Sequence, residues 1–163
     1  MEVEGKTKIA IVGEVNTGKS SFIKHLTNNS NIMIGPLPGE TVKSASYTYK
    51  DFVIIDTPGL NDVDKENSKK VNKELKTYDN VILFLNAAGT VLSKNELDLY
   101  NKLIKSKTNV LIVINKIDKA TSIDSVIRFV RQNTGDKAQV IAISTKTGEN
   151  IDQLEEAMLN FIS

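Results

Sequence analysis

The sequence contains no cysteine among its 163 residues. Disulfides, thiolate zinc sites and thiol catalysis are therefore excluded, and the composition is compatible with a reducing cytoplasm. The chain also has only one histidine, His25, so a metal cluster built from histidine and cysteine is not expected. We expect His25 to lie on the surface of a helix.

An excess of charge of one sign and a long apolar run are also missing. The formal net charge is +1, so no broad basic field is available to bind nucleic acid or an anionic membrane. No apolar run approaches the roughly 20 residues of a membrane-spanning helix. Met1–Gly5 is acidic and unlike a signal peptide, and the last residues offer no cysteine for prenylation. We therefore expect a cytoplasmic protein with no direct nucleic-acid or membrane signature in this chain.

The composition is that of an ordinary globular protein. Apolar residues make up 40% and charged residues 25% of the chain, far from the values of disordered or fibrous proteins. A length of 163 residues suits one hydrophobic core. We expect residues 1–163 to form a single domain.

Short apolar runs rich in β-branched residues recur along the chain, with helix-period segments between them. This alternation is typical of βα units around a mostly parallel sheet. The predicted strands are Lys8–Val12, Phe52–Asp56, Asn80–Asn86, Asn109–Asn115 and Gln139–Ile143. A further run, Ser46–Lys50, is separated from Phe52 by Asp51 alone, which is too short for a crossover helix. These two runs should form an antiparallel hairpin at one edge of the sheet.

Local signals predict two helix starts and one long loop. Ser93 with Glu96 forms the pattern of a capping box, and Asn150 with Gln153 looks like a variant of it. The only long irregular segment is about Asn28–Ser44, and a loop of that length in a compact domain is usually functional.

The first apolar run leads into Gly13-Glu14-Val15-Asn16-Thr17-Gly18-Lys19-Ser20, a complete phosphate-binding loop followed by a helical pattern. The glycines let backbone amides turn toward a phosphate group. Lys19 can reach the β- and γ-phosphates, and Ser20 can offer its hydroxyl to Mg²⁺ at the positive end of a helix. The predicted phosphate-binding residues are Glu14, Val15, Asn16, Thr17, Gly18, Lys19, Ser20 and Ser21.

Asp56-Thr57-Pro58-Gly59 ends another predicted strand, so Asp56 emerges where open α/β sheets place their ligands. An acid there can hold Mg²⁺ through water, and the Gly59 amide could face the γ-phosphate. Taken alone, this segment could equally be a simple exit from strand to turn.

Asn115-Lys116-Ile117-Asp118 lies at the end of another predicted strand, Asn109–Asn115, and has the groups that guanine recognition requires. The Asp118 carboxylate can accept from both N1–H and the 2-amino group of guanine, a donor pair that adenine lacks. Asn115 would brace the site and contact the purine, and the stem of Lys116 would cover one ring face. An isolated segment of this pattern could also be a solvated turn. After the last strand, backbone amides of Ser144, Thr145 and Lys146 could contact guanine O6.

Five segments thus follow one another, each at a strand end: the phosphate-binding loop, the long loop 28–44, Asp56–Gly59, Asn115–Asp118 and Ser144–Lys146. In this order they resemble the TRAFAC-class P-loop GTPases, specifically the Era-like branch. The resemblance covers the whole chain. It implies an α/β three-layer fold with a six-stranded, mostly parallel sheet, one antiparallel edge strand and helices on both faces. A weaker resemblance to dynamin-related GTPase domains leaves open that this chain is one G domain of a larger protein.

The resemblance also implies which residues act on the γ-phosphate. Pro38-Gly39-Glu40-Thr41 matches the stretch that carries the threonine ligand of Mg²⁺ in Era-like proteins, with Ser44 and Thr48 as competitors. Leu60 stands where Ras-like proteins have a water-orienting glutamine, so intrinsic hydrolysis should be slow. Several relatives with asparagine at the position of Asn16 bind K⁺ beside the phosphates, so the resemblance implies a K⁺ site at Asn16. The catalytic candidates are therefore Lys19, Thr41, Gly59 and Asn16, and the metal-binding candidates are Ser20, Thr41 and Asp56 for Mg²⁺ and Asn16 for K⁺.

The function expected from the sequence is a GTPase switch that binds GTP or GDP with Mg²⁺ and responds to an unknown protein effector or activator. A nucleotide-dependent homodimer is left open. Two alternatives remain: a nucleotide-sensing binding module with negligible hydrolysis, and an ATP-using P-loop kinase, for which Asp118 would be incidental. Val42-Lys43, Thr145 and Asn86 depart from the usual Era-like pattern.

Overall fold

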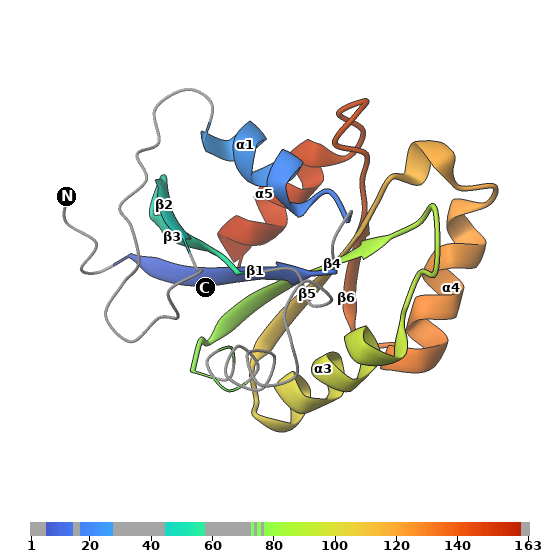
Figure 1. Ribbon diagram of the computed structural model, residues 1–163, viewed down its shortest axis with the longest axis horizontal. Coiled ribbons are helices and arrows are strands. Elements are labelled where there is room, and N and C mark those ends of the chain that lie inside the picture. Colours follow the sequence, from blue (N-terminus) through green and yellow to red (C-terminus); the bar gives the residue numbers. More distant parts are fainter. Residues whose placement is uncertain are drawn as a thin grey trace.

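The computed structural model describes residues 6–14, 17–27, 45–57, 73, 75 and 77–160, and these residues contain one sheet of six strands. The strand order is β2-β3-β1-β4-β5-β6 (Figure 1). The strands are β1 (Thr7–Gly13), β2 (Ala45–Tyr49), β3 (Phe52–Asp56), β4 (Asn80–Asn86), β5 (Asn109–Asn115) and β6 (Gln139–Ala142). The edge strand β2 runs antiparallel to β3, and all other pairs are parallel. The predicted sheet and its hairpin edge are confirmed.

Both faces of the sheet are buried, which explains why its strands are almost continuously apolar. Successive side chains of a strand point to opposite faces. In β1, Ile9 and Ile11 pack on one face, and Ala10 and Val12 pack on the other. The central strands of a parallel sheet therefore need apolar residues at every position.

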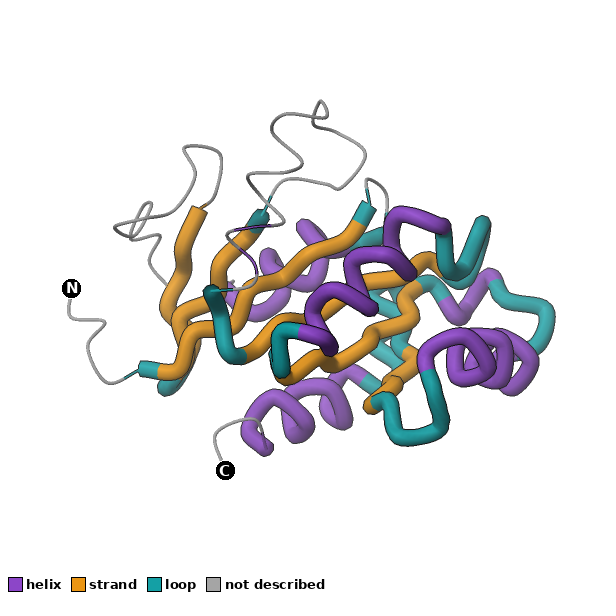
Figure 2. The backbone as a smooth tube through the Cα atoms, turned by 90° about the horizontal axis from the view of Figure 1, so that it is seen from below, coloured by secondary structure: helices purple, strands orange, loops and turns teal. Residues whose placement is uncertain are grey.

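Helices cover both faces and complete three layers. The helices are α1 (Lys19–Thr27), α3 (Lys94–Lys105), α4 (Ile123–Thr134), α5 (Ile151–Asn160) and a short 3-10 helix, Ile117–Lys119. The face formed by α1 and α5 contains Phe22 and Met158, and the face formed by α3 and α4 contains Leu103 and Val130. Figures 1 and 2 show the strands side by side between these two helical layers. In the described part of the chain, no helix combines the length and apolar character needed to cross a membrane.

The two predicted capping boxes have different outcomes. At α3, the Ser93 amide donates to Glu96 Oε1 (2.8 Å) and the Glu96 amide donates to Ser93 Oγ (3.2 Å), so this box is confirmed. The box predicted for Asn150 and Gln153 is wrong. Asn150 has a left-handed backbone with a φ of 63°, and its side-chain amide donates to the Ala142 carbonyl at 2.8 Å. Asparagine can form such local links instead of a helix cap, and here it connects the start of α5 to the end of β6.

Candidate functional site

Four parallel strands bring the predicted motifs to one edge of the sheet. The phosphate-binding loop follows β1, Asp56 ends β3, Asn115 ends β5, and Ser144 lies just after β6. Because β3, β1, β4, β5 and β6 are neighbours and parallel, their carboxyl ends share this edge. Ligands of open α/β sheets bind at this edge.

The two glycines of the phosphate-binding loop are required by close contacts of the backbone. Gly18 has a φ of 88°, and a β-carbon there would lie 1.9 Å from Asn115 Nδ2. A β-carbon on Gly13 would lie 2.9 Å from the Phe84 carbonyl oxygen. These distances are too short for any other residue without movement of the neighbours. The loop can pass this close to β4 and β5 only with glycine at both positions.

Lys19 is the charged centre of the phosphate end of the site. The residue is only 9% exposed. Its buried ammonium group has two partners, because it lies 3.1 Å from Asp56 Oδ1 and donates to the Thr57 carbonyl. The Thr57 hydroxyl in turn donates to the Ile11 carbonyl at 2.8 Å, which ties the end of β3 to β1. Because α1 begins at Lys19 and has no acid in its first turn, the positive end of the helix adds to the field of the ammonium group.

Asn115 connects the two halves of the site. Its side chain is fully buried, and its amide nitrogen donates to the Thr17 carbonyl at 2.9 Å and to Thr145 Oγ1 at 3.3 Å. Its carbonyl oxygen accepts from the Thr145 amide at 3.1 Å. One side chain therefore fixes both the phosphate-binding loop and the loop after β6, which is the bracing role that the sequence predicts.

Asp118 is held in place by a buried serine. Ser144, which is fully buried, donates its hydroxyl to Asp118 Oδ1 at 2.8 Å. The same hydroxyl accepts from the Thr147 amide at 3.1 Å. Lys116, just before this turn, has a left-handed backbone with a φ of 67°, an uncommon conformation for a residue other than glycine that is often found at functional sites. The exposed carboxylate thus has a fixed position beside Lys116.

A cleft of about 350 Å³ lies between the loops that follow β1, β5 and β6. Its volume is in the range of small-molecule binding sites. It is lined by Gly18, Ser21, Asn115, Lys116, Asp118, Lys119, Thr145 and Lys146. All of these except Lys119 are predicted nucleotide-binding residues. Lys119 directly follows Asp118, and the 3-10 helix brings it to the cleft. Its position next to the predicted guanine-recognition segment is the only signal in the sequence.

The remaining predicted residues fall into two groups. Val15, Asn16, Thr41, Ser44, Gly59 and Leu60 lie outside the described residues, as does the predicted loop 28–44. Among the described residues, Ser20 is exposed in the first turn of α1, and the half-buried Glu14 accepts the Thr17 hydroxyl at its carbonyl (2.9 Å). Thr48 is buried within β2, opposite Val53.

A buried acid near the phosphate-binding loop has a strongly shifted pKa. Glu96, which is 1% exposed, has its pKa raised from 4.5 to about 7, mainly because burial disfavours the carboxylate. The hydrogen bonds with Ser93 oppose this shift, and the negative charge of Glu14 adds to it. The sequence predicts the helix cap at Glu96 but not its electrostatic contact with the phosphate-binding loop.

Comparisons with known proteins agree with this geometry. A family model described as "50S ribosome-binding GTPase" matches residues 8–116. The tRNA modification GTPase MnmE of Wigglesworthia glossinidia brevipalpis is 31% identical in an alignment 160 positions long, which covers 91% of this chain and 33% of that protein. The GTPase Era of Halothermothrix orenii is 28% identical, with 94% of this chain and 55% of that protein covered. The chain thus spans between a third and about half of these curated relatives.

Among solved structures, the G domain of the FeoB iron transporter of T. maritima has a TM-score of 0.71 and 26% sequence identity. The similarity covers 97% of this chain and 99% of that one. The described strands and helices therefore have a counterpart of nearly the same extent.

Proposed function

The chain belongs to the family of 50S ribosome-binding GTPases, and on that premise we propose that residues 1–163 are a single G domain that binds GTP or GDP and hydrolyses GTP to GDP and phosphate. The observation that carries the proposal is the position of Asn115. It joins the loop of Lys19 to the loop that follows β6 and lies beside Asp118 in one cleft. A phosphate-binding cation and a carboxylate for the base are thus held by one rigid framework.

The choice of guanine follows from the chemistry of Asp118. Its carboxylate can accept from N1–H and the 2-amino group of guanine while Ser144 holds it from the protein side. Adenine has no such donor pair and would leave the carboxylate without these partners, which is unfavourable in a cleft. The stem of Lys116 would lie along the ring, and the backbone amides of Thr145 and Lys146 would donate to O6.

The phosphate end suits a nucleotide bound with Mg²⁺. Lys19 and Asp56 neutralise each other at 3.1 Å. The phosphates can replace Asp56 as the partner of Lys19, and Mg²⁺ can replace Lys19 as the partner of Asp56. Asp56 and the exposed Ser20 offer the oxygen ligands that Mg²⁺ prefers, and Thr41 would be a further ligand. When bound, Mg²⁺ neutralises charge on the β- and γ-phosphates.

The rate of hydrolysis depends on residues around the γ-phosphate. With Leu60 in place of a glutamine, we expect slow intrinsic turnover that needs help from K⁺ at Asn16, from a second copy of the chain or from a partner protein. The Gly59 amide would contact the γ-phosphate. We retain the cytoplasm as the expected location, because the proposed substrate is an intracellular nucleotide.

Titration calorimetry with GDP and with ADP, each with Mg²⁺, tests the base specificity. We expect GDP to bind at least about 100-fold more tightly than ADP, because two hydrogen bonds to a charged group are lost with adenine. Asp118→Asn should remove most of this difference, since an amide can accept only at its oxygen. Binding of ADP with the affinity of GDP would sink the proposal.

Phosphate release from GTP, measured in KCl and in NaCl, tests the hydrolysis. A higher rate in KCl that is lost in Asn16→Ala would support the role of K⁺, and equal rates in the two salts would remove it. If phosphate is released in neither salt although GTP binds, the chain by itself acts as the nucleotide-sensing module, the alternative that Leu60 leaves open.

A further inference from the structure

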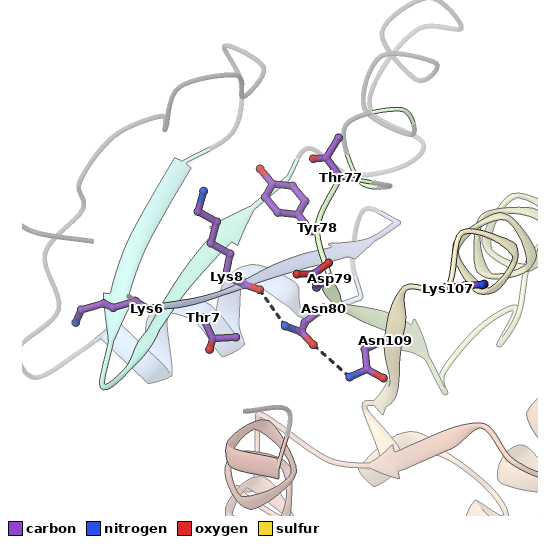
Figure 3. Close-up of a pocket in the computed structure, with 9 residues that line it drawn as sticks. All are labelled: Lys6, Thr7, Lys8, Thr77, Tyr78, Asp79, Asn80, Lys107 and Asn109. Atoms are coloured by element: carbon purple, nitrogen blue, oxygen red, sulfur yellow. Dashed lines mark hydrogen bonds between the residues drawn. The ribbon is translucent and has the colours of Figure 1, made fainter. Parts of the chain in front are cut away.

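A second, larger cleft lies at the opposite edge of the sheet, where β1, β4 and β5 begin. Its volume is about 770 Å³, within the range of ligand-binding sites. Its walls are the start of β1, residues 77–80 leading into β4, and the connection from α3 to β5 (Figure 3). No predicted nucleotide-binding residue lines it. Because the nucleotide cleft lies at the carboxyl ends of these strands, the two clefts can be filled independently.

The floor of this cleft is built from fixed amide groups. Asn109 Nδ2 donates to Asn80 Oδ1 at 3.3 Å, and Asn80 Nδ2 donates to the Lys8 carbonyl at 3.5 Å (Figure 3). The Asn109 backbone amide donates to the Asp79 carbonyl at 2.8 Å. Asn80 itself is only 7% exposed. A ligand would therefore meet a preorganised surface, which lowers the entropic cost of binding.

The charges of the cleft form a row that is positive at both ends. Lys6 and Lys107 lie at opposite ends, and Lys8 and Asp79 lie between them (Figure 3). Three cations and one anion give 3 − 1 = +2, whereas the whole chain carries only +1. Lys6 donates to the Lys50 carbonyl at 2.9 Å, which is a neutral partner. In the described part of the chain, the only ion pairs involve other residues.

We propose that this cleft binds an extended acidic segment of a partner polypeptide. Carboxylates toward the two ends of such a segment would pair with Lys6 and Lys107, and a central one with Lys8. Its backbone N–H groups would donate to Asp79 and to the exposed Asn109 side chain. The charged and hydrogen-bonding groups of such a peptide would thus complement those of the cleft, in the same order along the row.

A nucleic-acid strand fits this row less well. Its phosphodiester backbone presents negative charge and acceptors at every step, so that one phosphate would face the Asp79 carboxylate without a donor to offer it. The near-neutral net charge of the chain also provides no wider basic field, on which most nucleic-acid affinity depends. An acidic peptide carries both acceptors and donors and is therefore the better occupant.

The test is a titration of the ¹⁵N-labelled 163-residue chain, at low salt, with a short peptide of alternating glutamate and glycine, acetylated and amidated at its ends. We expect chemical-shift changes in the amides of residues 77–80 and 107–109, and weaker binding as salt is added. The same peptide with glutamine in place of glutamate should bind at least about tenfold more weakly, because the ion pairs are lost.

Two matched variants locate the binding. Lys8→Gln with Lys107→Asn should weaken binding about tenfold; asparagine suits position 107 because the backbone there is left-handed, with a φ of 62°. Arg128→Gln with Arg131→Gln removes the same number of positive charges from the exposed face of α4 and should leave the affinity unchanged within about twofold. The amide spectra report whether each variant is folded.

The proposal is overturned if the acidic peptide does not bind or shifts no amides at this cleft, or if the cleft variant binds the peptide like the α4 control. It is also overturned if a single-stranded RNA of similar length binds there more tightly than the peptide. Because the readout needs no nucleotide, failure here is separate from failure of GTP binding.

Discussion

Two independent properties of the backbone require glycine at position 18. The φ of 88° is unfavourable for any residue with a β-carbon, and that carbon would also overlap the Asn115 side chain at 1.9 Å. Gly148 has nearly the same φ, 85°, but nothing within 4 Å of a β-carbon. Comparing alanine substitutions at Gly18 and Gly148 therefore separates the energetic cost of backbone strain from the cost of the contact with Asn115.

We expect Gly148→Ala to lower the free energy of unfolding by about 1–2 kcal/mol, the cost of a left-handed alanine. Gly18→Ala should lower it by about 2 kcal/mol more, because Asn115 must move and its buried hydrogen bonds are disturbed. It should also abolish GDP binding. Urea unfolding and calorimetry measure the two effects. Equal losses of stability in the two variants would show that the contact with Asn115 is unimportant.

The shifted pKa of Glu96 makes stability depend on pH. Its pKa is about 7 in the folded chain, against an ordinary 4.5, so the folded state holds the proton more tightly between these values. The protonated Glu96 side chain therefore contributes fully to the stability of the fold below pH 4.5. This contribution falls by about 2 to 3 kcal/mol as the pH rises to about 7.

Glu96→Gln should remove this dependence, because glutamine is neutral and still accepts the Ser93 amide in the capping box. Relative to the unchanged chain, the variant should become more stable as the pH rises from about 5 to 8. Urea unfolding over this range measures the difference, and Asp98→Asn, on the exposed side of the same helix, is the control. Parallel curves for all three proteins would contradict the assigned pKa.

At the scale of elements, the hydroxyl of Ser144 joins the turn after β5 to the loop after β6. It donates to Asp118 and accepts from the Thr147 amide. Ser144→Ala should therefore weaken GDP binding about tenfold, because the carboxylate loses its fixed position. Ser122→Ala, which removes the helix cap of α4, should cost about 1 kcal/mol of stability and leave GDP affinity unchanged. Calorimetry that finds equal GDP affinities for the two variants would rule out this role of Ser144.

The elements themselves are largely predictable from the sequence, because their signals are local. The apolar run predicted as Asn109–Asn115 is a strand with the same ends, and the predicted cap at Ser93 is present. The cap predicted at Asn150 fails because that side chain finds a partner at Ala142. Such a contact depends on how β6 and α5 meet, and no pattern within either element encodes it.

The same limit applies to the site. That the residues of the proposed nucleotide cleft lie close together could be predicted from motifs at strand ends, because parallel strands gather their carboxyl ends at one edge. The proximity of Glu96 to Glu14 could not be predicted, and neither could the cleft beside Asn80. Both features depend on segments that are distant in the sequence and share no motif. Only the packed sheet brings Lys8, Asp79 and Lys107 into one row.

At the scale of the whole molecule, binding of GDP with Mg²⁺ should stabilise the fold. With GDP at about 100 times its dissociation constant, the stabilisation is about 2.7 kcal/mol, which corresponds to a rise in Tm of roughly 5–10 °C for a chain of 163 residues. ADP at the same concentration should raise the Tm by no more than about 1–2 °C, as should GDP with Asp118→Asn. Thermal unfolding followed by circular dichroism measures these shifts, and a similar rise with ADP would contradict guanine specificity.

In the proposed complex, the side chain of Asn115 should also determine how the two ends of a nucleotide affect each other. It is bonded both to the Thr17 carbonyl and to the backbone of Thr145, so ordering one loop restrains the other. Guanosine and pyrophosphate, supplied as separate molecules, should therefore each bind more tightly when the other is present. With Asn115→Ala the two fragments should bind independently, so that neither fragment raises the affinity of the other.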